Sequence, residues 1–231
     1  MPDPSFEVSH LLKEATQLKR EGDLSSAIKK LKQAESKIQR SSVDYGIETF
    51  LRLPMYLQAA GRSDEAIKQL DQLLSKYPEP WGHCVKFDKR GIYPMHLDLA
   101  RGSIYDKMRL VYQRDNNPSE ALPYSVLAET YFERTQLHVL AALESKWLGK
   151  AAPSGSSWEA IQWHEYETLS KFKEQLKPIE LKSAKPLLKK LKCSDLLSSL
   201  QIYANKLLHD FKQTDSAVIH DVEVLLSKEA E

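Results

Sequence analysis

The chain has 231 residues, of which 42% are hydrophobic and 28% are charged, as in an ordinary protein that buries its core without disulfides. Its 33 basic and 32 acidic residues leave a formal net charge of +1, which argues against a whole-protein field for nucleic acid or membrane. Only 8 glycines are present, so a β-sandwich or barrel with many tight turns is not favoured.

Signals for secretion and disulfide formation are absent from the sequence. Cys84 and Cys193 lie far apart in unrelated contexts, which favours two reduced thiols. Residues 1–15 contain no basic stretch followed by an apolar run, so they do not form a secretory signal. No segment approaches the ~20 apolar residues that a membrane-spanning helix needs. We therefore expect a cytoplasmic protein without a membrane partner.

The first predicted element is a helical hairpin. Over residues 8–18 the apolar side chains recur in steps of three and four, which is the pattern of one buried helix face. Gly22 can end this helix with a positive φ, and Asp23 can cap the next one. A second periodic run covers residues 24–38. Two amphipathic helices joined by so short a turn pack antiparallel.

A second hairpin is predicted over residues 50–78. Its two apolar runs are separated by the turn Gly61-Arg62-Ser63, and Asp64 and Glu65 place negative charge in the first turn of the following helix. Pro54 lies in the middle of the first helix, where it should kink or shorten that helix. A third, weaker copy covers residues 104–128, with its turn at Asp115-Asn116-Asn117-Pro118.

These hairpins resemble the tetratricopeptide repeat over roughly residues 8–132. The segments that carry the resemblance are GDLSSAIKKLKQA, GRSDEAIKQLDQLLSKYP and NNPSEALPYSVLA. Ala27, Ala66 and Ala121 fall where the family has a small residue at the helix crossing, and Pro78 falls at its closing proline. The resemblance implies an all-α fold, a tetratricopeptide-like α-solenoid of about three helical hairpins with a C-terminal helical module.

The chain departs from the family in its spacing. Family repeats have a period of 34 residues, whereas Ala27 and Ala66 are 39 residues apart and Ala66 and Ala121 are 55 apart. An insertion at about residues 79–97 explains the larger gap. Arg109 also occupies a position where the family keeps a small residue. The sequence therefore predicts a divergent repeat protein.

The second half contains periodic segments without a family motif. The repeat domain is expected to cover residues 1–149, followed by an exposed linker at 150–157, which is small, polar and interrupted by Pro153 and Gly155. The C-terminal module, residues 158–231, should pack on the repeats as a cap. Its predicted helices cover residues 158–176, 195–211 and 218–226, with Ser194 and Ser216 as caps of the last two.

The resemblance implies a concave groove lined by the first helix of each hairpin. Physically, an array of short hairpins forms an extended binding surface, so we predict a scaffold or adaptor that binds a protein or peptide. The basic bias of the groove suits a partner with acidic segments. Chaperone-tail receptors of the family use a Lys/Asn clamp, but the matching positions include no Asn. The predicted groove residues are Leu12, Thr16, Arg20, Arg52, Met55, Gln58, Asp106, Lys107, Leu110, Gln113 and Arg114.

The insertion is the main alternative site. We expect Trp81, Phe87 and Tyr93 to anchor it, so that Lys86, Lys89 and Arg90 form a basic lip beside Lys107 and Arg114. It also holds His83, Cys84, Asp88, His96 and Asp98. A Cys/His pair could act as nucleophile and base, and His83, Cys84 and His96 could bind a metal. An enzyme or metal protein is therefore one alternative.

No catalytic motif supports that alternative. Phosphate-binding glycine motifs, paired zinc ligands and a nucleophile elbow are absent, so no catalytic residue, cofactor or metal is assigned. The second alternative is an RNA-binding helical protein, because residues 171–192 contain 8 lysines against Glu174 and Glu180. The segment lacks arginine and aromatic residues at helical spacing, which disfavours nucleic acid.

Overall fold

The computed structural model describes residues 4–41, 43, 45–77, 94–147, 178–209 and 213–229, with the backbone alone for 94–96, 137–147 and 209. Within these ranges every regular element is an α-helix and no strand is present, which confirms the all-α class. A solenoid of tetratricopeptide type stays a prediction. The chain divides into two compact units, Met1–Lys76 and Tyr77–Glu231.

Several predictions from the sequence lie outside the described residues. They are the linker at 150–157, the helix at 158–176 and most of the insertion, including the proposed lip of Lys86, Lys89 and Arg90 together with His83 and Cys84. α6 begins at Pro94, within the range of about 79–97 that the sequence assigned to the insertion. The predicted boundary near residue 150 also differs from the division between Lys76 and Tyr77.

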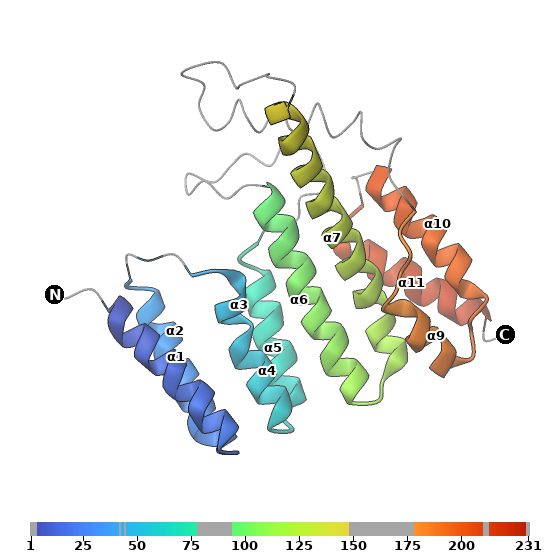
Figure 1. The fold of residues 1–231 in the computed structure, drawn as a ribbon. Helices are drawn as coiled ribbons and strands as arrows, with labels where there is room; N and C mark the ends of the chain where they lie inside the picture. Colours follow the sequence, from blue (N-terminus) through green and yellow to red (C-terminus); the bar gives the residue numbers. More distant parts are fainter. Residues whose placement is uncertain are drawn as a thin grey trace. The chain divides into compact units, whose positions relative to one another are not determined.

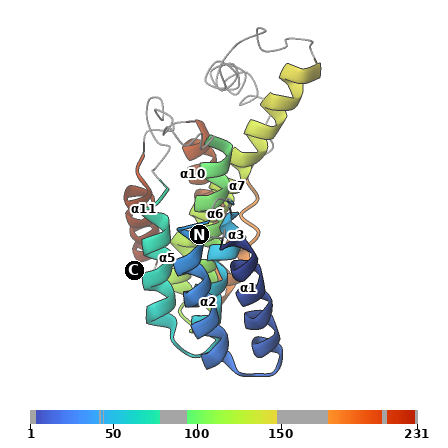
Figure 2. The same cartoon turned by 90° about the vertical axis from the view of Figure 1, so that its left-hand side faces the viewer.

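The first unit contains two hairpins. Gly22 adopts φ +87° and Gly61 adopts φ +74°, as their turns require, and Asp23 caps α2 by accepting a hydrogen bond from the Ser26 amide at 2.9 Å. Figures 1 and 2 show α1 and α2 side by side and antiparallel. The helices are α1 (Ser5–Arg20), α2 (Leu24–Ile38), α3 (Ile47–Phe50), α4 (Arg52–Ala59) and α5 (Ser63–Leu74).

Pro54 shortens the first helix of the second hairpin, as predicted. α3 ends at Phe50 and α4 begins at Arg52, with Leu51 between them. Because Pro54 has no N–H, it cannot bond to the carbonyl of Phe50, and the helix is interrupted at this point. Pro54 itself is buried, so its ring contributes to the core.

The core of the first unit follows the predicted periodic positions. α2 buries Ala27, Ile28, Leu31 and Ala34, and α5 buries Ala66, Leu70 and Leu73. Ala27 and Ala66 have no exposed surface, in keeping with their predicted place where helices pack closely. Burial of these apolar stripes holds the hairpins together.

The second unit is built on a long hairpin, α6 (Pro94–Arg114) and α7 (Pro118–Trp147). The connecting turn is the predicted one: Asn116 adopts φ +56°, and Asn117 Oδ1 accepts a hydrogen bond from Ser119 Oγ at 2.9 Å. The helices have 21 and 30 residues. They are therefore much longer than those of a 34-residue repeat.

The closest approach of α6 and α7 lies at a small residue other than position 109, where the family keeps a small residue and this chain has Arg109. The small residue at this contact is Gly102, seven positions earlier: a Cβ placed there would lie 3.0 Å from the Phe132 ring and 3.1 Å from Tyr131 Cβ. Arg109 instead lies on the outer side of α6, where its guanidinium pairs with Asp106. The closest contact between α6 and α7 is therefore at Gly102 and not at position 109, where the family keeps its small residue.

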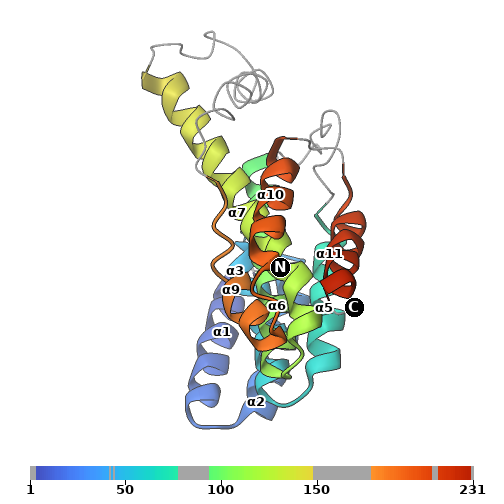
Figure 3. The same ribbon diagram turned by 90° about the vertical axis from the view of Figure 1, so that its right-hand side faces the viewer.

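Three further helices pack against α7: α9 (Ala184–Leu191), α10 (Leu196–His209) and α11 (Asp215–Glu229). Figure 3 views the second unit with α9 and α10 in front of α7. Analysis of the periodicity missed α9. It placed α11 three residues late, because Thr214, not Ser216, provides the cap: Thr214 Oγ1 accepts from the Ala217 amide at 3.3 Å.

Candidate protein-binding surfaces

In the first unit, Arg52 joins the first helices of the two hairpins. Its Nη2 donates to the Leu12 carbonyl at 2.8 Å and to Thr16 Oγ1 at 2.7 Å. The Thr16 hydroxyl in turn donates to the same carbonyl at 2.9 Å. Leu12, Thr16 and Arg52 are all half-buried. The guanidinium is therefore fixed through one nitrogen, on a side chain that is only half-buried.

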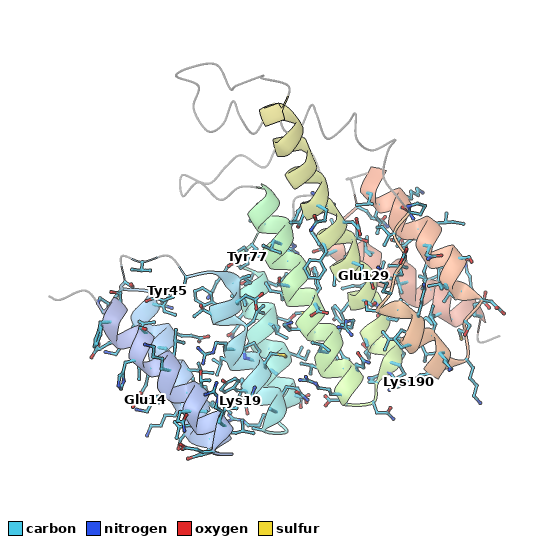
Figure 4. All side chains as sticks on the ribbon, in the orientation of Figure 1. Glu14, Lys19, Tyr45, Tyr77, Glu129 and Lys190 are labelled. Carbon is cyan, nitrogen blue, oxygen red and sulfur yellow. The ribbon has the colours of Figure 1, made fainter. Side chains whose placement is uncertain are left out.

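A second contact extends the same surface. The Lys19 ammonium lies 4.6 Å from the centre of the Tyr56 ring, a cation–π distance. Figure 4 labels Lys19 on α1, beside α4. Met55 and Gln58 on α4 are half-buried, and Arg20 at the end of α1 is exposed. We call this the α1/α4 surface, and its residues are Leu12, Thr16, Lys19, Arg20, Arg52, Met55, Tyr56 and Gln58.

In the second unit, α6 holds the remaining predicted groove residues that the structure describes. Asp106 accepts hydrogen bonds from Arg109 Nη2 at 2.6 Å and from Lys107 Nζ at 3.1 Å. Arg109 also donates to Gln113 Oε1 at 2.7 Å. Leu110 is half-buried beside this group.

Asp106, Lys107 and Arg109 form a small ion-pair cluster in which the carboxylate is paired with both cations. Burial of Asp106 opposes ionisation, but the hydrogen bonds and charges of Arg109 and Lys107 outweigh it, so the pKa of Asp106 lies below its usual value. Its carboxylate is therefore ionised and neutralised at neutral pH. The basic character that the sequence assigned to this face is reduced, since two cations are already paired.

The structure thus brings together two subsets of the predicted groove. Leu12, Thr16 and Arg52 are in contact in the first unit, and Asp106 and Gln113 share partners in the second. Arg114 is exposed at the end of α6. A single groove that includes both subsets stays a prediction.

A buried polar cluster, which the sequence analysis did not predict, links α6, α7 and α11. Asp215 Oδ2 accepts from Arg101 Nε at 3.0 Å and also from Arg101 Nη2 and the Tyr105 hydroxyl. Its Oδ1 accepts from the Tyr131 hydroxyl at 2.8 Å. Arg101 Nη1 donates to the carbonyl of Tyr77, which Figure 4 labels. We call Arg101, Tyr105, Tyr131 and Asp215 the Arg101 cluster, and each of these four residues is at most 3% exposed.

Burial and the Asp215 charge raise the pKa of both tyrosines, so that each stays protonated and donates its hydroxyl proton. For Arg101, burial would lower the pKa, but Tyr131 and Asp215 outweigh it and the pKa is raised. The cluster is thus a closed ion pair with two neutral donors. It positions the start of α11 and offers no group poised for proton transfer.

A second buried ion pair lies nearby on the same helices. Arg134 Nε is 3.1 Å from Asp98 Oδ2, and neither side chain is more than 4% exposed. The Arg134 guanidinium also lies 5.6 Å from the centre of the Tyr131 ring. Asp98, which the sequence placed with the candidate chemical residues of the insertion, is therefore part of the core of α6 and α7.

One signal for the Arg101–Asp215 pair is present in the sequence. Arg101 occupies the same face of α6 as Leu97, Ile104 and Met108, all of which are buried. A charged residue in an apolar stripe needs a buried partner. Its partner Asp215 is 114 positions away, so the sequence could indicate the need but not the residue that meets it.

Within the described ranges, no three His, Cys, Asp or Glu residues gather as metal ligands would, and no helix is long and apolar enough to cross a membrane. Cys193 is a half-buried free thiol whose Sγ donates to the Leu191 carbonyl. No family model, curated protein or solved structure matches the chain.

Proposed function

We propose that this chain is a divergent helical repeat protein of tetratricopeptide type that holds a segment of another protein on its α1/α4 surface. The observation that supports it most is the position of Arg52. Its hydrogen bonds to Leu12 and Thr16 fix the guanidinium between the first helices of two successive hairpins. A fixed arginine loses less conformational freedom when it binds a carboxylate.

The neighbours of Arg52 suit an acidic segment with some apolar side chains. Lys19 and Arg20 add positive charge on α1, while Met55 adds an adaptable apolar contact on α4. A partner with carboxylates and a small apolar residue would match this composition. The proposed role is that of a scaffold or adaptor without catalysis.

The test is affinity purification of the full chain from its native cell, followed by mass spectrometry. We expect at least one protein to be lost with Arg20→Glu and with Met55→Glu, because Arg20 is exposed and Met55 is half-buried on the α1/α4 surface. Arg62→Glu is the matched control: Arg62 is exposed, lies in the same unit and pairs only locally with Glu65. Surface changes of this kind alter stability by less than ~0.5 kcal/mol.

The comparison with the control decides the result. A partner that survives Arg62→Glu but not Arg20→Glu or Met55→Glu supports the α1/α4 surface. Partners retained equally by all three folded variants would show that binding uses another surface. Circular dichroism of each variant confirms that its helices are intact.

A further inference from the structure

A second surface with a strong charge bias lies on and around α9. Residues 178–192 contain five lysines and a single acidic residue, Glu180. The inner side of α9 packs on α7 through Ala184, Leu187 and Leu188, each at most 1% exposed. Lys190 is labelled on α9 in Figure 4. We call the exposed lysines the α9 lysine surface: Lys182, Lys185, Lys189, Lys190 and Lys192.

The backbone beneath this surface is firmly held. Glu129 of α7 accepts hydrogen bonds from the amides of Lys182 at 2.7 Å and Ser183 at 2.6 Å. Asn205 of α10 accepts from the Ile179 amide at 3.1 Å, and the buried Leu181 is kept at φ +46°. A non-glycine residue at positive φ persists only where its surroundings impose it. The lysines therefore extend from a rigid platform.

Most of the positive charge on this platform is not neutralised by the described residues. Only Lys182 forms an ion pair there, with Glu180 at 3.3 Å, and both side chains are largely exposed. Lys189 and Lys190 lie in the last turn of α9, where the helix dipole favours cations. Lys185 lies in the first turn, where the dipole disfavours them, so helix stability does not account for the whole surface.

An apolar side chain on α10 indicates the kind of partner. Ile202 is 73% exposed, and the residue before it, Gln201, donates to the Glu180 carbonyl at 3.0 Å. Ile202 thus directly follows, on α10, a residue that contacts the segment leading into α9. The phosphate backbone of a nucleic acid could bind the lysines, but it has no apolar group to place on Ile202. Residues 178–202 also contain no arginine or aromatic residue for stacking on bases.

We propose that the α9 lysine surface and Ile202 together bind an acidic segment of a partner protein, with carboxylates on the lysines and an apolar side chain on Ile202. Lys185 and Lys189 are four positions apart on α9, a spacing of about 5–6 Å that matches carboxylates on one face of a helical peptide. This site is separate from the α1/α4 surface and does not depend on it. The two sites together would let the chain join two proteins.

The test measures binding of labelled probes to the full chain by fluorescence anisotropy. The probes are a synthetic helical peptide with glutamates on one face and leucines beside them, a glutamate-only peptide of equal length, and single-stranded RNA. We expect the glutamate–leucine peptide to bind tightest and to weaken as salt rises, since exposed charges are screened. Lys185→Glu/Lys189→Glu should weaken it by at least about tenfold.

Two controls separate this site from general charge effects. Lys13→Glu/Lys68→Glu changes two exposed lysines of the first unit by the same net charge and should leave the affinity within about twofold. Ile202→Ser should weaken the glutamate–leucine peptide several-fold and the glutamate-only peptide very little. Tighter binding of RNA, equal losses in both lysine variants, no effect of Ile202→Ser, or no binding of either peptide would each overturn the proposal.

Discussion

At the scale of single residues, the Arg101 cluster shows how this fold accommodates a charge inside a helical core. Arg101 has Asp215, two tyrosine hydroxyls and a backbone carbonyl as partners, so its donors are met without water. Such a pair is weak evidence for stability, because both ions lose their hydration. The pair instead fixes the position of α11 on α6, since removing one partner leaves the other charge buried and unpaired.

We therefore expect Asp215→Ala to destabilise the protein by about 3–5 kcal/mol, measured by urea unfolding. Asp195→Ala is the control, because Asp195 is exposed just before α10, and even the loss of an aspartate at this helix start should cost no more than about 1 kcal/mol. The double variant Arg101→Met/Asp215→Leu should recover most of the loss, because it removes both charges. A loss below ~1 kcal/mol for Asp215→Ala would contradict a closed cluster.

Glu35 on α2 gives a pH-dependent prediction. Burial raises its pKa, and the nearby charges of Lys76 and Lys32 only partly offset this. The folded state therefore binds a proton more readily than the unfolded state, so Glu35 lowers stability as pH rises above its unfolded pKa of about 4.3. We expect Glu35→Gln to be more stable than the parent chain at pH 7 and equal to it below about pH 4. Urea unfolding across this range measures it, and a gain that persists at low pH would contradict it.

At the scale of helices, the local pattern predicted most elements and their turns. Gly22, Gly61, Asp23 and the Pro54 interruption were all readable, because each depends on a residue's own backbone preference or hydrogen bonding. The missed or misplaced features depend on distant partners. α9 is only eight residues long, so its short apolar run of Ala184, Leu187 and Leu188 is too brief to show a period, and it is stabilised by packing on α7.

The α6–α7 contact is the clearest case. The family pattern indicated position 109, whereas Gly102 faces Tyr131 and Phe132 in the folded protein. Where two helices approach depends on their lengths. α6 begins at Pro94, earlier than the start at residue 104 that the periodic pattern predicted. Six residues of the α1/α4 surface were among the predicted groove residues, whereas Lys19 and Tyr56 were not. The hydrogen bonds that fix Arg52 were not predicted, because they require two helices to be adjacent.

Gly102 makes a testable prediction at this scale. A Cβ there would lie 3.0 Å from two atoms of the Phe132 ring, so Gly102→Leu should force the helices apart and cost about 1–3 kcal/mol. Phe132→Ala should make the substitution less damaging, because it removes the ring that the new side chain meets. A double-mutant cycle by urea unfolding measures this coupling. Additive effects of the two substitutions would show that Phe132 does not limit the contact.

At the scale of the whole molecule, the division between Lys76 and Tyr77 predicts two units of separate stability. Each unit has its own core: Leu31, Leu53 and Leu70 are at most 2% exposed in the first, and Leu122 and Leu127 are fully buried in the second. A unit with its own core can open while the other stays folded, and hydrogen exchange detects such openings.

The last prediction compares matched core substitutions in the two units. Leu31→Ala and Leu122→Ala each remove a buried leucine, at 2% and 0% exposure, and should each cost about 2–5 kcal/mol. Each substitution should lower the stability of one core only. We therefore expect Leu31→Ala to speed amide exchange in α1, α2, α4 and α5 and to leave α6, α7 and α10 protected. Leu122→Ala should speed exchange in α6, α7 and α10 and leave α1, α2, α4 and α5 protected. Hydrogen-exchange mass spectrometry of the full chain at low denaturant resolves the two sets of helices. If either substitution instead raises exchange equally throughout both sets, the chain unfolds as one cooperative body, and the division at Lys76 reflects the density of contacts rather than separate stability.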